Sequence, residues 1–304
     1  MRGRYKRILI IADIEGSSGC WSYRASSFMT RPWARACLEM TRDVNAVVQA
    51  LFAGGACQVT IRDFHRTGYN LLAQHMDPRA DLVQGYRVGP VPGIGDPGYT
   101  QAVMFIGMHA ASGSEGFLPH TLTSRIRQLR VNGRLLSEVE LFAASLAPFG
   151  LHPVFFSGDE MACRQAAVAI KGIRTHPIDK TGNPKHFTPE RWRHALALAA
   201  VQALENQVAK PYQPPGPFRA SLTLRDGAGS ARKLARRWKL RFSGTELHLN
   251  AHDIHDLYRQ LINVSYLTPA ALRIIPVTLW LSNLYGRLGL WWVRRYLARE
   301  GLAG

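Results

Sequence analysis

The sequence predicts an α/β protein with a largely parallel sheet flanked by helices, then a smaller α+β part and a basic amphipathic C-terminal extension. The first observation is an apolar run at residues 8–12, typical of a buried strand. The second is a helical pattern over residues 30–55, and the third is a return to apolar runs at 57–61 and 102–107. Strand, helix and strand in this order favour parallel pairing, because parallel strands need a crossover connection.

The first helix is expected between Thr30 and the Gly54–Gly55 pair. Thr30 suits the N-cap, Pro32 suits the first turn, and the two glycines end the helix. The apolar residues recur at the spacing of one buried helical face: Trp33, Cys37, Met40, Val44, Val47, Val48 and Leu51.

The middle of the chain continues to alternate strands and helices. Asn132–Gly133 can supply the positive φ angles of a tight hairpin turn. A helix is then expected over residues 137–150, a strand over 152–158, and another helix from about Asp159.

The proline-rich segment Lys210–Pro217 indicates a connection, and strands followed by a helix are expected beyond it. We therefore divide the chain into three parts: residues 1–212, residues 213–266, and an extension of residues 267–304. At 304 residues, the chain is long enough for one large domain or two ordinary ones.

Composition indicates a globular protein with an unusual charge. Hydrophobic residues make up 46% and charged residues 19% of the chain, which excludes a disordered protein. The net charge of +17 attracts polyanions, whether nucleic acid, anionic membrane or acidic substrate. The basic start lacks the long apolar segment of a signal peptide, and the four cysteines form no close pair. We expect a cytoplasmic protein with reduced thiols.

Acidic and histidine side chains follow three of the expected strands. Asp13 and Glu15 end the first strand, His65 follows the second, and His109 follows the third. The carboxyl ends of parallel strands meet at one crevice, so these side chains predict a site for zinc or a similar divalent ion. Taken singly, Asp13 and Glu15 suit a solvated turn, each histidine suits a surface or capping position, and Glu138 suits an exposed helix position.

Six motifs carry a family resemblance. They are "DIEGSSG", "RDFHRTGYNLL", "FIGMHA", "HT" at His120–Thr121, "VNGRLLSE" and "VFFSGDE", and they occur in order over about residues 7–170. With them the chain resembles the zinc-dependent D-aminopeptidases associated with dipeptide transport operons, and a weaker similarity continues to about residue 266. The resemblance implies that residues 1–212 form an α/β metallopeptidase catalytic domain and that residues 213–266 complete the family fold.

The resemblance also implies a site and an activity. In that family a binuclear zinc centre, with two Zn2+ per subunit, is held by the positions that match Asp13, Glu15, His65, His109 and Glu138. The aspartate is expected to bridge the ions, and the catalytic histidine matches His120. The implied activity is removal of the N-terminal residue from small peptides, including those with D-amino acids. The family forms ring-like homo-oligomers.

The expected chemistry leaves two points open. Paired divalent ions can polarise a peptide carbonyl and lower the pKa of a water molecule. His120 is then free to move protons or to act as a nucleophile, and we favour proton transfer. Asp159 or Glu160 could bind the substrate ammonium group, or both could simply begin a helix that its dipole stabilises.

The chain departs from the family pattern beside the expected site. Phe64 and Arg66 replace small residues around His65, which puts the D-dipeptide preference in doubt. Glu140 stands where family members have glycine, and it is either a carboxylate near the site or a solvated helix charge.

The extension and the basic cluster Ser230–Arg241 raise further alternatives. Trp280, Trp291 and Trp292 lie among arginines, which is typical either of a helix at an anionic membrane surface or of a helix packed on protein. The basic cluster is an anion-binding patch or a solvated edge. The competing functions are a membrane- or nucleic-acid-associated binding protein with a vestigial metal site, and a metallohydrolase of another bond. Nucleic acid is the less favoured partner.

Overall fold

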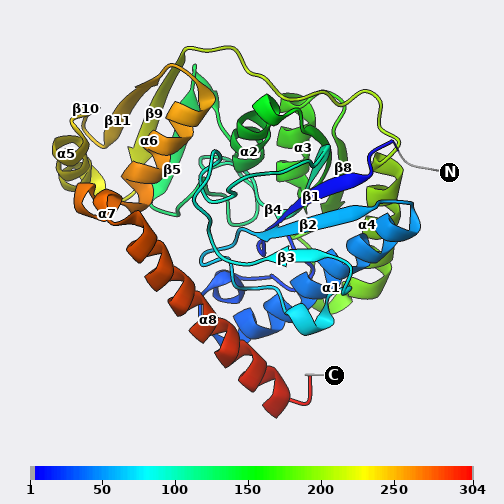
Figure 1. Cartoon of the computed structure of the whole chain (residues 1–304). Helices are drawn as coiled ribbons and strands as arrows, with labels where there is room; N and C mark the ends of the chain where they lie inside the picture. Colours follow the sequence, from blue (N-terminus) through cyan, green and yellow to red (C-terminus); the bar gives the residue numbers. More distant parts are fainter. Residues whose placement is uncertain (1–3, 303–304) are drawn as a thin grey trace.

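The computed structural model describes residues 4–302 and contains two sheets with helices packed around them (Figure 1). The strands are β1 (Arg7–Ala12), β2 (Gln58–Asp63), β3 (Asp81–Val83), β4 (Ala102–Met108), β5 (Ile126–Val131), β6 (Arg134–Leu135), β7 (His152–Asp159), β8 (Arg174–Ile178), β9 (Phe218–Leu224), β10 (Arg241–Ser243) and β11 (Glu246–Ala251). The helices are α1 (Arg31–Ala53), α2 (Glu138–Leu146), α3 (Glu160–Ala169), α4 (Pro189–Ala203), α5 (Gly227–Trp238), α6 (Ile254–Tyr266), α7 (Pro269–Arg273) and α8 (Ile275–Arg299).

The larger sheet has the order β3-β2-β1-β4-β7-β8, and every neighbouring pair is parallel. This confirms the predicted α/β fold. From β1 the chain adds β2 and β3 on one side and then β4, β7 and β8 on the other. The strand order therefore reverses between β1 and β4, the place where open α/β sheets bind ligands at the carboxyl ends of their strands.

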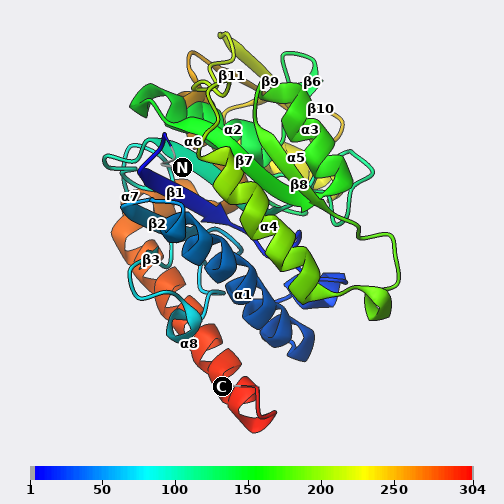
Figure 2. The same cartoon turned by 90° about the vertical axis from the view of Figure 1, so that its right-hand side faces the viewer.

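Helices cover both faces of this sheet, so β1 is apolar throughout. Ile8 and Ile10 belong to the core that contains α1, whereas Leu9 and Ile11 belong to the core that contains α2 and α3. Figure 2 shows α1 and α4 side by side on the first of these faces. The predicted first helix is confirmed, because the Thr30 hydroxyl accepts a hydrogen bond from the Trp33 N–H and the helix ends at Gly54.

The smaller sheet is antiparallel, with the order β10-β11-β9-β5-β6. The predicted hairpin is present as β5 and β6, with Asn132 at φ 49° and Gly133 at φ 82°. Its strand β5 pairs with β9, so the hairpin joins strands from far along the chain. The division at residues 212 and 213 stays a prediction, and the smaller sheet draws strands from both sides of it.

The C-terminal helix α8 crosses the N-terminal end of α1 and packs against it (Figure 1). Trp292 stacks on Trp33 with ring centroids 6.2 Å apart, and Arg35 pairs with Glu300 at 2.9 Å. A Cβ atom at Gly286 would lie 2.3 Å from the Tyr69 ring, so only glycine permits this approach. One face of the extension is therefore packed on the body of the protein. Within residues 4–302, no helix combines the length and apolar character needed to cross a bilayer.

Candidate metal centre

The first group of candidate ligands lies at the carboxyl ends of β1 and β2. Asp13 and Glu15 follow β1, His65 follows β2, and all three side chains are buried. His65 Nδ1 lies 3.1 Å from Asp13 Oδ1 and 3.1 Å from Glu15 Oε2. The two carboxylates thus share one imidazole nitrogen, although β1 ends at Ala12 and Glu15 lies in the turn that follows.

The second group comprises His109, His120 and Glu138. His109 follows β4, and Glu138 is the first residue of α2. His109 Nε2 lies 3.4 Å from Glu138 Oε1, and the His109 and His120 rings stack with centroids 3.6 Å apart. In each group, the candidate ligand atoms lie within 4.8 Å of one another.

Asp13 connects the two groups. Its Oδ1 atom faces His65, and its Oδ2 atom lies 3.4 Å from His109 Nε2. The structure therefore brings together all five residues predicted as ligands, with His120 beside them. One carboxylate oxygen toward each group is the arrangement that a bridging aspartate requires.

The three histidines share one hydrogen-bonding pattern. In each, one ring nitrogen lies against a backbone carbonyl. When that nitrogen carries the proton, the other ring nitrogen is unprotonated and its lone pair can bind a metal ion. The contacts are His65 Nε2 with Ser26 O at 2.9 Å, His109 Nδ1 with Ala110 O at 3.0 Å, and His120 Nδ1 with Leu118 O at 2.9 Å. His109 Nε2 is buried and has no hydrogen-bond partner among residues 4–302. Bare imidazole nitrogens beside buried carboxylates fit a zinc ion.

The electrostatics of the cluster attract positive charge. Burial, reinforced by the charge of Glu15, raises the pKa of Asp13 to about 7. Burial alone would lower the pKa of His65 and His109, but the facing carboxylates raise both to about 10. Burial likewise opposes charge on Glu138, yet His109 lowers its pKa. The carboxylates thus stabilise positive charge on the imidazoles. Bound divalent cations would supply that positive charge in place of the protons.

Comparisons with known proteins identify the family of this chain. The model of a family described as D-aminopeptidase matches residues 6–262. The chain belongs to the D-aminopeptidase family. It is therefore an enzyme, a hydrolase acting on peptide bonds, and the resemblance seen in the motifs is confirmed.

One sequence match and one structure match from Bacillus subtilis show how far the likeness extends. The D-aminopeptidase of strain 168 is 26% identical over 216 residues, which is 69% of this chain and 78% of the relative. The structure of the "Zn-dependent D-aminopeptidase DppA", described as a self-compartmentalizing protease, matches with a TM-score of 0.77 at 23% identity. The match covers 86% of this chain and 97% of that one, and at this identity it shows the shared fold.

Two glycines let the loop after β1 approach β4. A Cβ atom at Gly16 would lie 2.2 Å from Met108 O, and one at Gly107 would lie 2.2 Å from Asp13 O. Gly107 also has φ 75°, in the left-handed region that favours glycine, at an irregularity in the pairing of β4 with β7. Larger residues at either position would push Asp13 and Glu15 away from His109.

Asp63 organises the loop that carries His65, a role that the sequence reasoning missed. Its carboxylate accepts hydrogen bonds from the backbone N–H groups of Asn70 and Leu71. The Asn70 side-chain amide donates to Asp63 Oδ1 at 2.9 Å and to the His65 carbonyl at 2.7 Å. Both residues stand in the motif "RDFHRTGYN", so their polar character on either side of His65 was the available signal.

A second buried network fixes the loop after Glu15. Asp43 accepts from the Ser18 backbone and hydroxyl groups, both at 2.8 Å, and from Arg193 Nε at 2.9 Å. Lys180 donates to the carbonyls of Ser17 and Cys20, at 2.5 and 2.7 Å. These residues come from α1, α4 and the segment after β8, and no local pattern links them.

The sequence left two alternatives open for Asp159, Glu160 and Glu140. Asp159 caps α3 by accepting from the Met161 and Ala162 N–H groups, and Glu160 is exposed. Glu140 is buried rather than solvated, because it forms a capping box with Ser137.

The two unusual neighbours of His65 point to different surroundings. The Phe64 ring packs on Phe142 and Tyr86, at 4.8 and 5.3 Å, so it belongs to the core. Arg66 is exposed and donates from Nε to the Ser26 carbonyl at 2.7 Å. Arg66 is therefore the one of the two that can meet a substrate.

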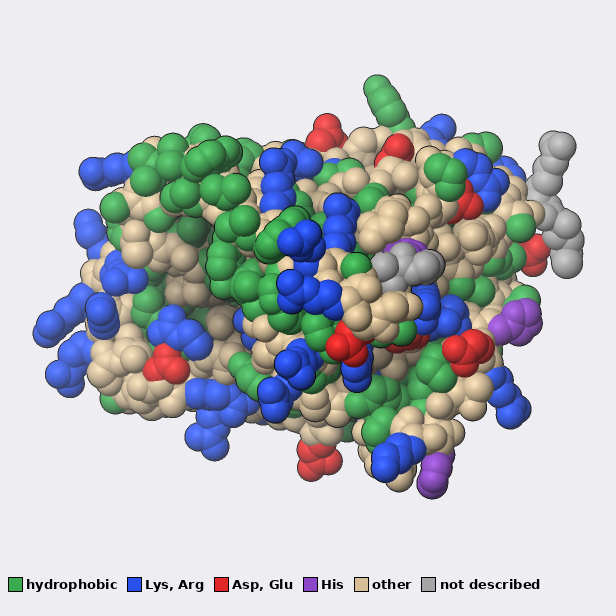
Figure 3. Space-filling model, turned by 90° about the horizontal axis from the view of Figure 1, so that it is seen from below, with side chains coloured by type: hydrophobic (Ala, Val, Ile, Leu, Met, Phe, Trp, Pro, Cys, Tyr) green, Lys and Arg blue, Asp and Glu red, His purple; other side chains and the backbone are tan. Residues whose placement is uncertain are grey.

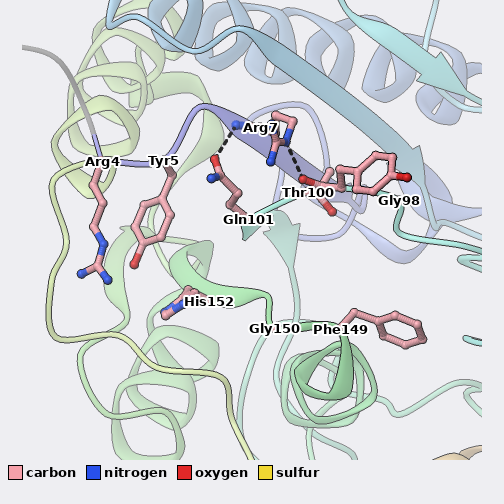
Figure 4. A pocket seen from close by; sticks show the side chains of 10 residues that line it. Arg4, Tyr5, Arg7, Gly98, Thr100, Gln101, Phe149, Gly150 and His152 are labelled. Carbon is pink, nitrogen blue, oxygen red and sulfur yellow. Dashed lines mark hydrogen bonds between the residues drawn. The ribbon is translucent and has the colours of Figure 1, made fainter.

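The amino ends of the same strands carry a separate hollow. Its volume is about 430 Å³, and Arg4, Tyr5, Arg7, Gln101 and His152 are among its lining residues (Figure 4). Arg7 and His152 begin β1 and β7, so this hollow lies at the sheet edge opposite to Asp13. Among residues 4–302 none of its lining residues is acidic, which distinguishes it from the candidate metal centre.

Proposed function

We propose that this protein is a binuclear zinc aminopeptidase that removes the N-terminal residue of small peptides, including peptides with D-amino acids. Asp13, Glu15, His65, His109 and Glu138 would hold the two ions, with Asp13 between them. The observation that carries this proposal is the position of Asp13, which turns one oxygen to each group of ligands. Family membership and the zinc dependence of DppA support the choice of metal.

The catalytic step needs a proton acceptor beside the metals. When bound, paired zinc ions polarise a peptide carbonyl and lower the pKa of a water molecule toward neutrality. The chain supplies His120, whose Nδ1 atom lies against the Leu118 carbonyl, so that Nε2 is free to exchange a proton. Burial and the charge of His109 both lower the pKa of His120. A neutral His120 can take a proton during attack and return it to the leaving amine.

The same comparisons support a homo-oligomer. DppA is described as self-compartmentalizing, and the match covers 97% of its chain. A ring-like assembly that encloses the candidate sites would restrict access to small peptides. We therefore infer that the substrates are short and that this chain assembles with copies of itself.

The decisive experiment combines metal content with a substrate panel. Purified protein should contain about two zinc ions per chain, because the candidate ligands form two groups that Asp13 connects. L- and D-dipeptides and aminoacyl amides are assayed with zinc, manganese and cobalt, using wild type, His120→Ala and the control His248→Ala. His248 lies on β11 with an exposed side chain, so its loss should leave hydrolysis unchanged.

Two results would overturn parts of the proposal. Peptide hydrolysis that survives His120→Ala would remove His120 from the mechanism. A zinc-loaded protein that cleaves esters or phosphodiesters but no peptide would support a metallohydrolase of another bond.

A further inference from the structure

The outer face of α8 carries a continuous apolar stripe. Its residues recur at intervals of three or four, so they line one side of the helix. They are Val277, Trp280, Leu281, Leu284, Leu288 and Trp291, and each is between 42% and 63% exposed. Figure 3 looks at the molecule from below and shows hydrophobic side chains gathered over this region, with Lys and Arg side chains beside them.

The opposite face of α8 is apolar too, but it is covered. Leu290, Val293 and Leu297 are buried in the core that contains α1, and Gly289 lies against Phe28. A helix that is apolar all round is normally buried in protein or lipid. Within residues 4–302, α8 is covered on one face only, so its outer stripe lacks a partner.

The charges around the stripe are almost all of one sign. Arg273 precedes it, Arg295 and Arg299 follow it on the same side, and Arg287 and Arg294 flank it; all five are exposed. The Arg295 guanidinium lies 5.2 Å from the centre of the Trp291 ring. The acidic residue in this segment, Glu300, is already paired with Arg35. An apolar stripe bordered by arginine and tryptophan is typical of helices that lie at membrane interfaces.

We propose that α8 docks this protein on an anionic lipid bilayer, lying in the plane of the membrane. The six residues of the stripe enter the boundary between headgroups and acyl chains, and the flanking arginines pair with lipid phosphates. The stripe runs over the 15 residues from Val277 to Trp291, which gives an apolar contact about 22 Å long. A second copy of this chain fits less well, because pairing two such faces would set arginines against arginines without an acidic partner.

The docking helix is independent of the proposed peptidase chemistry, because it lies outside the residues 6–262 that match the family. The C-terminal helices nevertheless contact loops that carry residues of the candidate metal centre. Tyr69, in the loop after His65, meets Gly286 of α8. Tyr266, which ends α6 just before α7, donates to the carbonyl of Leu122, close to His120. Docking through α8 would therefore set the orientation of the site relative to the membrane.

The test is flotation of the full-length protein with vesicles at low salt. One vesicle is pure phosphatidylcholine, and the other contains roughly one third phosphatidylglycerol, which supplies the anionic surface. Wild type should float with the anionic vesicles, and added salt should weaken this binding. The double variant L284E/L288E should bind about tenfold less or weaker still. Its control is V168E/L198E, which places the same charges on exposed apolar positions of α3 and α4.

A second pair of variants tests whether binding depends on the arginines of α8 or on the net charge of the whole protein. R294Q/R295Q should reduce binding about tenfold or more, because each interfacial arginine contributes to anionic lipid affinity. R236Q/R237Q on α5 changes the net charge equally and should bind as wild type does.

Four outcomes would overturn the proposal. The first is failure of wild type to float with anionic vesicles, and the second is flotation of L284E/L288E equal to that of wild type. Loss of binding confined to R236Q/R237Q would move the docking surface to α5. A fall in oligomeric mass for L284E/L288E without lipid, measured by light scattering, would instead identify the stripe as a contact between copies of this chain.

Discussion

The imidazole rings of His109 and His120 lie almost parallel, with an angle of 14° between their planes and 3.6 Å between their centroids. Two stacked imidazoles resist being charged together, since each cation would face the other at close range. His109 is held by the carboxylates of Asp13 and Glu138, so the pair favours positive charge there and a neutral His120. In the proposed mechanism, the stack thus separates His109, which would bind metal, from His120, which would transfer protons.

We predict that His120→Ala lowers kcat by about 10²–10⁴, the usual contribution of a positioned acid–base group. The five candidate ligands remain, so zinc content should not change. Steady-state kinetics and elemental analysis of the same sample check both parts. Loss of zinc together with activity would make His120 a ligand instead.

Asp63→Ala should weaken zinc binding about 10- to 100-fold, the range found when residues that orient metal ligands are removed. The change leaves buried N–H groups of Asn70 and Leu71 unpaired, which should lower the free energy of unfolding by about 1–3 kcal/mol per group. Competition with a chelator and urea unfolding measure the two effects. The control Asp81→Ala removes an exposed aspartate and should alter neither.

Glu140→Gly should lower the free energy of unfolding by about 1–2 kcal/mol, because it removes a capping box and places glycine in a helix. The Tyr212 hydroxyl also loses its hydrogen bond to Glu140 Oε1, now 3.1 Å long. Glu190→Gly is the matched control, because Glu190 is an exposed residue in the first turn of α4. If the two variants unfold at the same urea concentration, the buried cap contributes nothing beyond helix propensity.

Arg193→Met should destabilise the protein by about 3–5 kcal/mol at neutral pH, because it leaves the buried Asp43 carboxylate without its cation. Burial raises the pKa of Asp43, and Arg193 limits that rise, so the variant should have a still higher Asp43 pKa. A raised folded-state pKa means that the folded protein binds more protons than the unfolded chain, so this penalty shrinks as pH falls through the folded pKa.

The measurement for this variant is the difference in unfolding free energy from wild type, taken at neutral pH and near pH 5. Each wild-type measurement at the same pH serves as the control, because pH effects common to both proteins then cancel. A difference that stays constant with pH would mean that Asp43 is not the titrating group.

Local patterns predicted the elements that carry the site. The Thr30 cap, the Gly54 end of α1, and the Asn132–Gly133 turn are each set by neighbours in sequence, and all are confirmed. The convergence of Asp13 and His109 followed from parallel pairing alone.

Long-range contacts escaped prediction because no local pattern encodes them. The pairing of β5 with β9, the Asp43–Arg193 pair and the burial of Glu140 all depend on segments far apart in the chain. The extension was predicted to meet either protein or membrane. One face of α8 meets protein, and hydrophobicity alone does not assign different partners to the two faces of one helix.

The pairing of β5 with β9 also bears on the order of events during synthesis. Glu138 enters the site at the end of the β5–β6 hairpin, and β5 is held in its sheet by Phe218–Leu224. A ribosome finishes Asp13, Glu15, His65, His109 and Glu138 long before it reaches β9. Until that later strand emerges, the hairpin has no sheet to join, and the segment leading to Glu138 lacks its support. The nascent chain would therefore carry every candidate ligand without a completed centre, which delays proteolytic activity until most of the protein has been made.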